Sequence, residues 1–353
     1  MIEVNTKNHP YQVDLEFGGS NQVGQKVAQV WSPRQIVVIS DMNVAELYLK
    51  PVVKQLRDAG FTVSTAVVAA GEDSKNLDLV QTIIKQMSND HFTRYDGVIG
   101  LGGGVITDLA GVVASLYMRG ISLIQIPTSM TAQVDASVGG KTAVNLGEVK
   151  NVIGTFYQPD YVLVDPALLT SLDDRDLVEG YAESIKMSLL AGGDFATLTG
   201  QVNSVDDLKN KVVPIIEASI QYKRDVVVED EYDEGRRQVL NFGHTFGHAI
   251  ELMAHGELRH GEAVAIGMVA ITDRLTRDGY TQAGVSDEII NRLLPVGLPV
   301  FSEYIGEGDF FDLVLRDKKR SDDRINFIGL AKVGEPIIVK KDVRKLEAFV
   351  KGY

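Results

Sequence analysis

Between Arg34 and about Asp165, short apolar runs rich in β-branched residues alternate with segments of helical periodicity. The apolar runs cover Gln35 to Ser40, Phe61 to Val68, Gly97 to Leu101 and Ile121 to Ile126. Helical periodicity follows up to Asp58, from Lys75 to Ser88 and from Val105 to Tyr117. Buried strands that alternate with helices are typical of parallel βαβ units. The pattern therefore predicts a doubly wound, mostly parallel sheet, and such sheets bind ligands at the carboxyl ends of their strands.

The remainder of the chain has a different pattern. After Thr170, segments with a period of about 3.6 residues dominate, at 175–191, 205–229, 238–255, 260–278 and 286–294. One exception is Ile325 to Val339, where the pattern indicates a β-hairpin around Gly334. We therefore expect a Rossmann-like α/β domain over residues 1–170 and a mainly α-helical domain with a small β-hairpin over residues 171–353.

The composition limits which metal ligands and which kinds of binding partner the chain can have. The 353 residues include no cysteine, so any metal site must use His, Asp or Glu. With 35 basic and 48 acidic residues, the formal net charge is −13, which argues against general binding to nucleic acid or to an anionic membrane. The N-terminal segment lacks the pattern of a signal peptide, and no apolar run approaches the ~20 residues of a membrane span. We expect a cytoplasmic protein in which an anionic substrate needs a local basic pocket.

A glycine-rich turn follows the third apolar run. Gly102, Gly103 and Gly104 come directly after it, and Asp108 lies in the first turn of the expected helix. Successive glycines let the backbone approach a pyrophosphate, and a helix N-terminus offers free N–H groups. Val105 stands where the G-x-G-x-x-G fingerprint has its third glycine, so a plain strand-to-helix turn remains the alternative. Asp41, after the first run, suits either a ribose hydroxyl or a helix N-cap.

Four of the six histidines lie within residues 244–260. His244 and His248 share one face of the expected helix, and His260 opens the next helix, from which it can fold back toward them. This spacing suits metal binding or paired acid–base chemistry. The candidate carboxylate ligand lies in the segment EGYAESIK, where Glu179, Glu183 and Lys186 share one helical face. Spacing alone fits a surface ion pair between Glu183 and Lys186 better than a functional pair.

Basic residues cluster in motifs. The segment QVDASVGGKTAVNLGEVKN holds Asp135, Lys141 and the pair Lys150-Asn151. A lysine after two glycines places an ammonium beside an oxyanion, and asparagine adds directed donors. Further cations stand at Lys223-Arg224, Arg236-Arg237 and Lys318-Lys319-Arg320. Focused positive charge in an acidic chain suits an anionic small molecule, with loop solubility as the alternative for the glycine segment.

Six motifs follow one another along the chain: GGGVITDLAG, RGISLIQIPTSMTAQVDASVGGKTAVN, KNVIGTFYQP, EGYAESIK, NFGHTFGHAIE and HGEAVAIGM. In order and spacing they resemble the 3-dehydroquinate synthase family, over nearly the whole chain from the Asp41 loop to Lys318-Lys319. Glycerol and iron-dependent alcohol dehydrogenases, in the wider superfamily, share the glycine-rich turn and a helical metal domain. This sequence is distinguished from those dehydrogenases by the VGGK and KN pair together with E-x-x-K and N-F-G-H-x-x-x-H.

The resemblance implies roles for individual residues. It implies zinc (or cobalt) held by Glu183, His244 and His260, with His248 acting on the substrate. The NAD+ contacts it implies are Asp41, Glu72, Lys75, Gly103, Gly104, Asp108, Thr128 and Ser129, with Lys150 and Ser171 nearby. The contacts it implies for a sugar-acid phosphate are Asp135, Lys141, Asn151, Lys186, Lys223, Arg237, Asn241 and one of Lys318 or Lys319. Arg119, in the YMRG motif, is implied as a phosphate contact that reaches across the interface of a homodimer.

The resemblance also implies a reaction. The family converts 3-deoxy-arabino-heptulosonate 7-phosphate to 3-dehydroquinate and phosphate, in the shikimate pathway to aromatic amino acids. The implied steps are transient oxidation by NAD+, elimination of phosphate, re-reduction, ring opening and an intramolecular aldol closure. Two alternatives stay open: a sister sugar phosphate cyclase, such as a 2-deoxy-scyllo-inosose synthase, and a metal-dependent polyol dehydrogenase. The retained set of Lys141, Asn151, Lys186 and Arg237 favours a substrate with a carboxylate over those of the sister cyclases.

The chain departs from the pattern of the family in two places. The family commonly has PTTLLAQVDSS where this chain has PTSMTAQVDAS, from Pro127 to Ser137. The family usually has TLP-x-RE where this chain has SLDDRD, from Ser171 to Asp176. These departures concern the cofactor residues Ser129 and Ser171 more than the catalytic ones.

Overall fold

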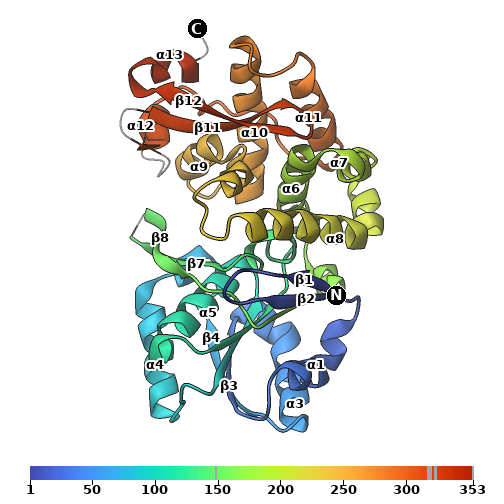
Figure 1. Cartoon of the computed structure of the whole chain (residues 1–353), viewed down its shortest axis with the longest axis vertical. Coiled ribbons are helices and arrows are strands. Elements are labelled where there is room, and N and C mark those ends of the chain that lie inside the picture. Colours follow the sequence, from blue (N-terminus) through green and yellow to red (C-terminus); the bar gives the residue numbers. More distant parts are fainter. Residues whose placement is uncertain (148, 316–319, 322–323, 352–353) are drawn as a thin grey trace. The chain divides into compact units, whose positions relative to one another are not determined.

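The computed structural model describes residues 1–147, 149–315, 320–321 and 324–351. Over these residues the chain divides into two compact units, whose elements are labelled in Figure 1. The first unit comprises Met1–Leu172 and Lys223–Tyr232, and the second comprises Asp173–Tyr222 and Asp233–Tyr353. The last turns of the long helix α8 (Val205–Glu229) therefore belong to the first unit and its earlier turns to the second.

Within the described residues, the first unit is built on a seven-stranded sheet with the order β1-β2-β9-β6-β5-β3-β4. Its strands are β1 (Ile2–Val4), β2 (Tyr11–Leu15), β3 (Gln35–Asp41), β4 (Thr62–Val68), β5 (Gly97–Gly102), β6 (Ser122–Pro127) and β9 (Tyr161–Val164). Neighbouring strands are parallel, except that β1 and β2 are antiparallel. The predicted doubly wound, mostly parallel sheet is confirmed, and the sheet also includes β1, β2 and β9, which the apolar pattern did not predict.

Helices cover both faces of this sheet (Figure 1). They are α1 (Val23–Val30), α2 (Met42–Val44), α3 (Lys50–Asp58), α4 (Leu77–Asn89) and α5 (Gly104–Leu116), with the short turns η1 (Gly19–Gln22), η2 (Ala45–Leu49), η3 (Glu72–Ser74), η4 (Tyr117–Arg119), η5 (Ala132–Ala136) and η6 (Pro166–Ser171). Within β3, Val37 and Ile39 pack with α4 and α5, whereas Ile36 and Val38 pack with α1 and α3. All four side chains are buried. Because both faces are covered, the strand has a continuous apolar run instead of an alternating one.

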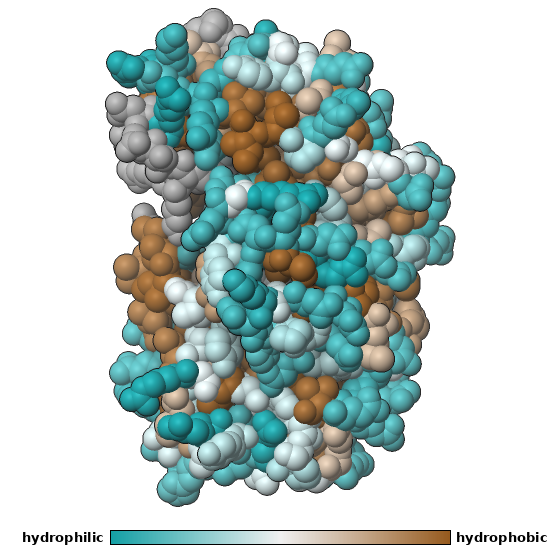
Figure 2. Space-filling view, in the orientation of Figure 1, coloured by the Kyte–Doolittle hydropathy of each residue, from teal (hydrophilic) through white to brown (hydrophobic). Residues whose placement is uncertain are grey.

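A β-hairpin forms a separate small sheet in the first unit. Its strands β7 (Lys141–Leu146) and β8 (Val149–Phe156) pair antiparallel and pack against α5. Apolar surface is visible over this hairpin in Figure 2, and its exposed apolar side chains are Leu146, Val149, Val152 and Phe156. The structure corrects the loop interpretation of this segment, because Lys141, Lys150 and Asn151 lie on paired strands.

The second unit is mainly helical over the residues described. Its helices are α6 (Asp174–Ala191), α7 (Gly193–Gly200), α9 (His244–Met253), α10 (His260–Arg277), α11 (Val285–Leu293), α12 (Phe310–Leu315) and α13 (Leu346–Lys351), with the short turns η7 (Arg236–Asn241), η8 (Leu294–Val296) and η9 (Val343–Lys345). Strands β10 (Arg320–Ser321), β11 (Arg324–Lys332) and β12 (Glu335–Asp342) form an antiparallel sheet, in which β11 and β12 are the predicted hairpin. In the part of the chain that is described, no helix has the length and apolarity that a membrane span requires.

The helix expected over 238–255 is shorter in the structure. Residues 236–241 form the separate turn η7, and α9 begins only at His244. Gly243 lies between them with a φ of 79°, in the left-handed region that a Cβ atom disfavours. The chain therefore changes direction at Gly243, and Asn241 and His244 do not share one helix.

Candidate functional site

Three metal-ligating side chains come together in the second unit. Glu183 lies on α6, while His244 and His260 are the first residues of α9 and α10. The Nε2 atom of each imidazole lies 3.6 Å from Oε1 of Glu183. Donor atoms bound to a tetrahedral zinc ion are about 3.3–3.6 Å apart, so this spacing fits a divalent ion between them. Two imidazoles and one carboxylate also leave a fourth position for water or substrate.

Close backbone contacts hold the three ligand helices together. A Cβ atom at Gly267 of α10 would collide with the carbonyl oxygen of Gly243, just before α9. A Cβ atom at Gly261 of α10 would collide with the carbonyl oxygen of Glu179 on α6. These two glycines therefore allow α10 to approach both neighbours more closely than side chains permit, and this approach brings His260 to His244 and Glu183.

The electrostatics of the cluster favour a bound cation. Burial by itself raises the pKa of the fully buried Glu183 carboxyl, but the Lys186 ammonium and the His260 imidazole outweigh it and lower that pKa to about 2. Burial lowers the pKa of His260, whereas the carboxylates of Glu183 and Glu251 raise it to about 10. Glu183 is thus ionised at neutral pH, which is the form of a carboxylate that binds a metal ion. The carboxylates of Glu183 and Glu251 also hold an extra proton on His260 in the metal-free protein, and a bound metal ion would replace that proton at Nε2.

The outer nitrogens of the two imidazoles have different partners. Nδ1 of His260 donates a hydrogen bond to Oε2 of Glu251 (3.1 Å), and Nδ1 of His244 donates to the carbonyl oxygen of Phe242 (3.1 Å). A proton on Nδ1 leaves the Nε2 lone pair of a neutral imidazole available to a metal. Glu251 was not predicted as a site residue. Its signal was in the sequence, because it follows His244 by two helical turns and so lies on the same face.

Other predicted residues of the second unit surround this cluster. Lys186 forms an ion pair with Glu183 in which both side chains are buried, so the surface pair expected from spacing is wrong. The exposed His248 ring lies with its centroid 5.3 Å from that of His244 and 5.9 Å from that of His260. Arg237 is buried on η7. Asn241 ends that turn, where its Nδ2 donates to the Gln238 carbonyl oxygen (3.1 Å).

In the first unit, the glycine turn lies at the carboxyl ends of β5 and β6. Gly103 is the N-cap of α5, and Gly104 is its first residue. The backbone N–H of Thr128 donates to the carbonyl oxygen of Gly102 (2.9 Å). A Cβ atom at Gly103 would come within 3.2 Å of the Ser129 hydroxyl oxygen. The structure thus brings these residues of the predicted NAD+ site together at a helix N-terminus, a position that suits a pyrophosphate.

The buried Lys75 side chain connects residues from three motifs. Its Nζ lies 2.5 Å from Oδ2 of Asp108 and 2.5 Å from Oδ1 of Asn151. Burial raises the pKa of the Asp108 carboxyl, and the nearby Lys75 ammonium only partly offsets this. Nearby, Oε1 of Glu72 accepts a hydrogen bond from Nδ2 of Asn145 (2.8 Å).

Asn145, on β7, was also missed by the sequence analysis. Its Oδ1 accepts a hydrogen bond from the backbone N–H of Asn151 (2.8 Å), while its Nδ2 binds Glu72. Asn151 has a φ of 54°, which is uncommon for a residue with a side chain and often marks a functional position. Nothing in the segment TAVNL indicated this role, because the pairing of β7 with β8 brings the two asparagines together.

The remaining predicted residues of the first unit are more scattered. Asp135, on η5, forms an ion pair with Lys223 near the end of α8. Asp41 accepts hydrogen bonds on Oδ1 from the backbone N–H groups of Asn43 and Val44, so it does cap α2. Ser171 is exposed, and its hydroxyl donates to the Leu168 carbonyl oxygen (3.0 Å).

Two predicted phosphate contacts stand apart from these groups. Arg119 is exposed on η4 with a φ of 69°, directly after Met118, whose φ is 51°. Two consecutive non-glycine residues in the left-handed region indicate a constrained turn. Lys318 and Lys319 lie outside the described residues.

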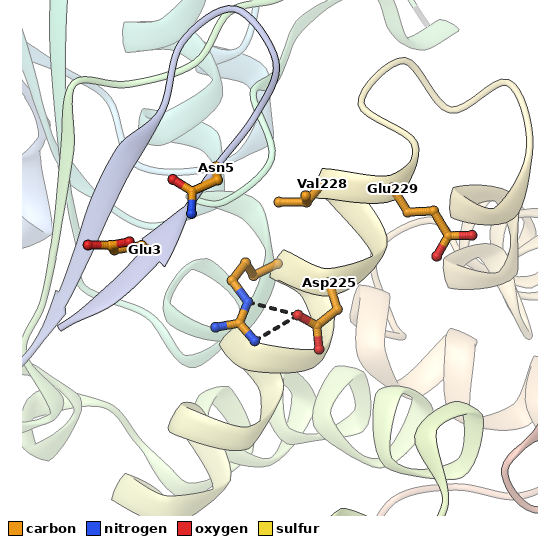
Figure 3. Close-up of a pocket in the computed structure, with 6 residues that line it drawn as sticks. Glu3, Asn5, Asp225, Val228 and Glu229 are labelled. Carbon is orange, nitrogen blue, oxygen red and sulfur yellow. Dashed lines mark hydrogen bonds and ion pairs between the residues drawn. The ribbon is translucent and has the colours of Figure 1, made fainter.

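The first unit also has a surface pocket that is separate from the predicted site residues (Figure 3). Residues of β1 and its end line one side, and the last turns of α8 line the other; they are Glu3, Asn5, Arg224, Asp225, Val228 and Glu229. The Arg224 guanidinium is paired with Asp225 (2.7 Å). The lining contains none of the predicted site residues.

Comparison with known proteins identifies the family. Two family models match, 3-dehydroquinate synthase N-terminal over residues 65–179 and 3-dehydroquinate synthase C-terminal over residues 180–320. A 3-dehydroquinate synthase of Leuconostoc mesenteroides is 54% identical over 351 residues, which cover 99% of each chain. The chain belongs to the 3-dehydroquinate synthase family. A 3-dehydroquinate synthase of Lactiplantibacillus plantarum is 46% identical over 335 residues, which cover 95% of this chain and 93% of that protein.

The resemblance inferred from the six motifs is thus confirmed, and solved structures agree on the fold of this 3-dehydroquinate synthase family member. A 2-deoxy-scyllo-inosose synthase complexed with carbaglucose-6-phosphate, NAD+ and Co2+ matches with a TM-score of 0.89 at 24% identity and covers 100% of both chains. A 2-epi-5-epi-valiolone synthase from Streptomyces hygroscopicus with NAD+ and Zn2+ bound matches with a TM-score of 0.86 at 26% identity, over 99% of this chain and 98% of that one.

Proposed function

We propose that this chain is a 3-dehydroquinate synthase, which converts 3-deoxy-arabino-heptulosonate 7-phosphate to 3-dehydroquinate and inorganic phosphate. The observation that carries the proposal is the 54% identity to a relative of that name over 99% of both chains. The net reaction releases phosphate without net oxidation, so the enzyme is a carbon–oxygen lyase. It serves the shikimate pathway toward aromatic amino acids.

Residues 1–170 are the proposed NAD+-binding domain, and residues 171–353 the metal- and substrate-binding domain. In the first unit, the glycine turn at the N-terminus of α5 suits the pyrophosphate. The proposed NAD+ contacts are Asp41, Glu72, Lys75, Gly103, Gly104, Asp108, Thr128, Ser129, Lys150 and Ser171. In the second unit, Glu183, His244 and His260 would hold Zn2+ or Co2+, and the 3.6 Å spacing of their donor atoms fits such an ion.

When bound, the metal and NAD+ supply Lewis-acid and hydride-transfer chemistry, respectively. The residues of the chain bind and orient the substrate and move protons. Lys186 and Arg237 are buried cations of the second unit that would bind anionic groups of the substrate. His248 is exposed beside the metal cluster, so its imidazole can give or accept a proton on a substrate oxygen.

Further substrate contacts are proposed for individual residues of each unit. Asn241, which ends η7, is proposed to bind the substrate beside Arg237. In the first unit, Lys141, Asn151 and Lys223 are proposed to meet the carboxylate or phosphate. Asp135, which forms an ion pair with Lys223, is proposed to contact the ring hydroxyls. Lys318 or Lys319 would add one more cation.

The deciding experiment measures phosphate release from 3-deoxy-arabino-heptulosonate 7-phosphate by the full chain with NAD+ and zinc, while the NADH absorbance is followed in the same cuvette. We expect phosphate to appear with no net NADH. Phosphate release from glucose 6-phosphate alone would instead favour a sister cyclase such as a 2-deoxy-scyllo-inosose synthase. NADH accumulation with simple polyols would favour a dehydrogenase.

The active form is proposed to be a cytoplasmic homodimer, in which Arg119 of each subunit contacts the phosphate in the site of the other. Arg119 is exposed on a constrained turn, so its guanidinium is accessible to another chain. Sedimentation of the active protein tests this, and we expect a dimer. A fully active monomer would contradict the proposal.

A further inference from the structure

Glu251 contacts one of the candidate metal ligands without belonging to the ligand set. It lies on α9, on the helix face that carries His244, and reaches across to the start of α10. There its Oε2 accepts a hydrogen bond from Nδ1 of His260 at 3.1 Å. The Glu251 side chain is only 16% exposed, so water screens this contact weakly.

We propose that Glu251 is a positioning residue that orients His260 for metal binding, an inference that rests on the metal site of the proposed function. A carboxylate that accepts the Nδ1 proton fixes the tautomer in which Nε2 carries the lone pair. It also fixes the rotation of the ring, so that Nε2 faces Oε1 of Glu183. Finally, it makes Nε2 a stronger metal ligand. The ring becomes more positive when Nε2 shares its lone pair with the metal, and the carboxylate compensates that positive charge.

The two imidazoles differ in how much they depend on such a partner. The His244 side chain is 11% exposed, and its Nδ1 is held by the Phe242 carbonyl oxygen, which no side-chain substitution removes. The His260 side chain is 34% exposed and therefore has less surrounding protein to restrain its ring. Its Nδ1 partner is a side chain from another helix. Glu251 therefore restrains the ligand that packing restrains least.

The test uses the metal-free full chain and measures its zinc dissociation constant by competition with a chromophoric chelator. Loss of an outer partner of a ligand histidine typically weakens metal binding by about 10–100-fold, and we expect this for Glu251→Ala. Glu251→Gln should lose less, because an amide oxygen still accepts the Nδ1 proton without the charge. Glu217→Ala, which removes an exposed carboxylate on α8 of the same unit, is the matched control and should bind zinc as the parent does.

Two further readouts separate positioning from general stabilisation. The visible absorption of the cobalt-substituted protein reports ligand geometry and should change in Glu251→Ala but not in Glu217→Ala. Glu251→Ala should change the unfolding temperature of the metal-free protein only slightly. It should reduce much more the rise in unfolding temperature that zinc produces. A zinc affinity of Glu251→Ala within twofold of the parent overturns the proposal, and so does a loss of metal-free stability without weaker zinc binding. If the parent itself binds no zinc, the metal site of the proposed function falls together with this inference.

Discussion

Glu183 and Lys186, one turn apart on α6, form an ion pair in the interior of the second unit, with side-chain exposures of 1% and 2%. Two charges of opposite sign at this depth stabilise each other only as long as both are present. The candidate metal ligand is thus held ionised by a lysine that is also a candidate substrate contact. The pair therefore places a candidate metal ligand and a candidate substrate contact within one buried ion pair.

Removing the Lys186 charge should destabilise the metal-free protein. Lys186→Met keeps most of the side-chain volume but removes the ammonium beside the Glu183 carboxylate, which still faces the imidazoles of the two candidate ligand histidines. Breaking a buried pair costs about 3–5 kcal/mol, and the remaining imidazoles place this variant at the lower end of that range. Urea unfolding of the metal-free protein measures this loss, and zinc should restore part of it because a cation again faces the carboxylate. Lys209→Ala, which removes an exposed partner of Asp174, is the control. Equal effects of the two substitutions would contradict the buried-pair account.

Loss of a candidate ligand should abolish metal retention. His260→Ala removes a donor atom 3.6 Å from Glu183 and leaves two ligands, which hold zinc poorly. The metal content after dialysis should fall close to zero while the helical circular dichroism stays near that of the parent. His255→Ala, an exposed histidine between α9 and α10, should retain metal. One zinc per chain retained by His260→Ala would exclude it as a ligand.

Asn145 should matter for NAD+ binding although it is not a predicted contact. Asn145→Ala removes the hydrogen bond to Glu72 and the acceptor for the backbone N–H of Asn151. Each lost hydrogen bond of this kind costs about 1 kcal/mol, so the loss of both should lower the NAD+ affinity by up to about 30-fold. Titration calorimetry measures the affinity, with the exposed Asn203→Ala as control. Unchanged binding would show that the glutamate is placed without this asparagine.

The pair of His9 and Asp160 should add a pH-dependent increment of stability. Asp160 raises the pKa of His9, against the partial burial that lowers it, across a 3.0 Å contact. Because the pKa of an unfolded histidine is about 6.5, the extra stability is complete below that pH and is lost as the pH rises through the higher folded pKa. The side chain is 46% exposed, so solvent screening limits the increment to below about 1 kcal/mol.

Urea unfolding at about pH 6 and about pH 9 tests this increment. The parent should lose more stability than His9→Asn over that interval. His91→Asn, which removes an exposed histidine of the same unit, should behave as the parent does. A parallel pH dependence of the parent and His9→Asn would contradict the prediction.

The sheet could be predicted where its strands are covered on both faces. The run QIVVIS became β3 because its successive side chains enter two different cores. The hairpin β7–β8 could not be predicted in this way, because its outward positions carry apolar residues such as Leu146 and Val149. Those exposed side chains hide the period of two residues on which a strand prediction depends.

The candidate site, like the sheet, could be predicted from the sequence only in part. Histidine spacing alone predicted that His244, His248 and His260 come near one another, and the ring distances agree. The choice of Glu183 came from the family resemblance, since spacing favoured a surface pair. Its burial depends on how α6 packs in the second unit, which local periodicity does not report. The ligand and contact roles of these residues stay predictions until metal and substrate are measured.

The backbone contacts at Gly261 and Gly267 have a practical consequence for protein engineering. At both positions a main-chain carbonyl oxygen of a neighbouring segment faces α10 with no side chain between them. Even a methyl group there would push the helices apart and displace the ligand residues that they carry. A library that varies the interior of this unit should therefore keep both glycines and randomise around them, and variants selected for a different metal should keep them unchanged.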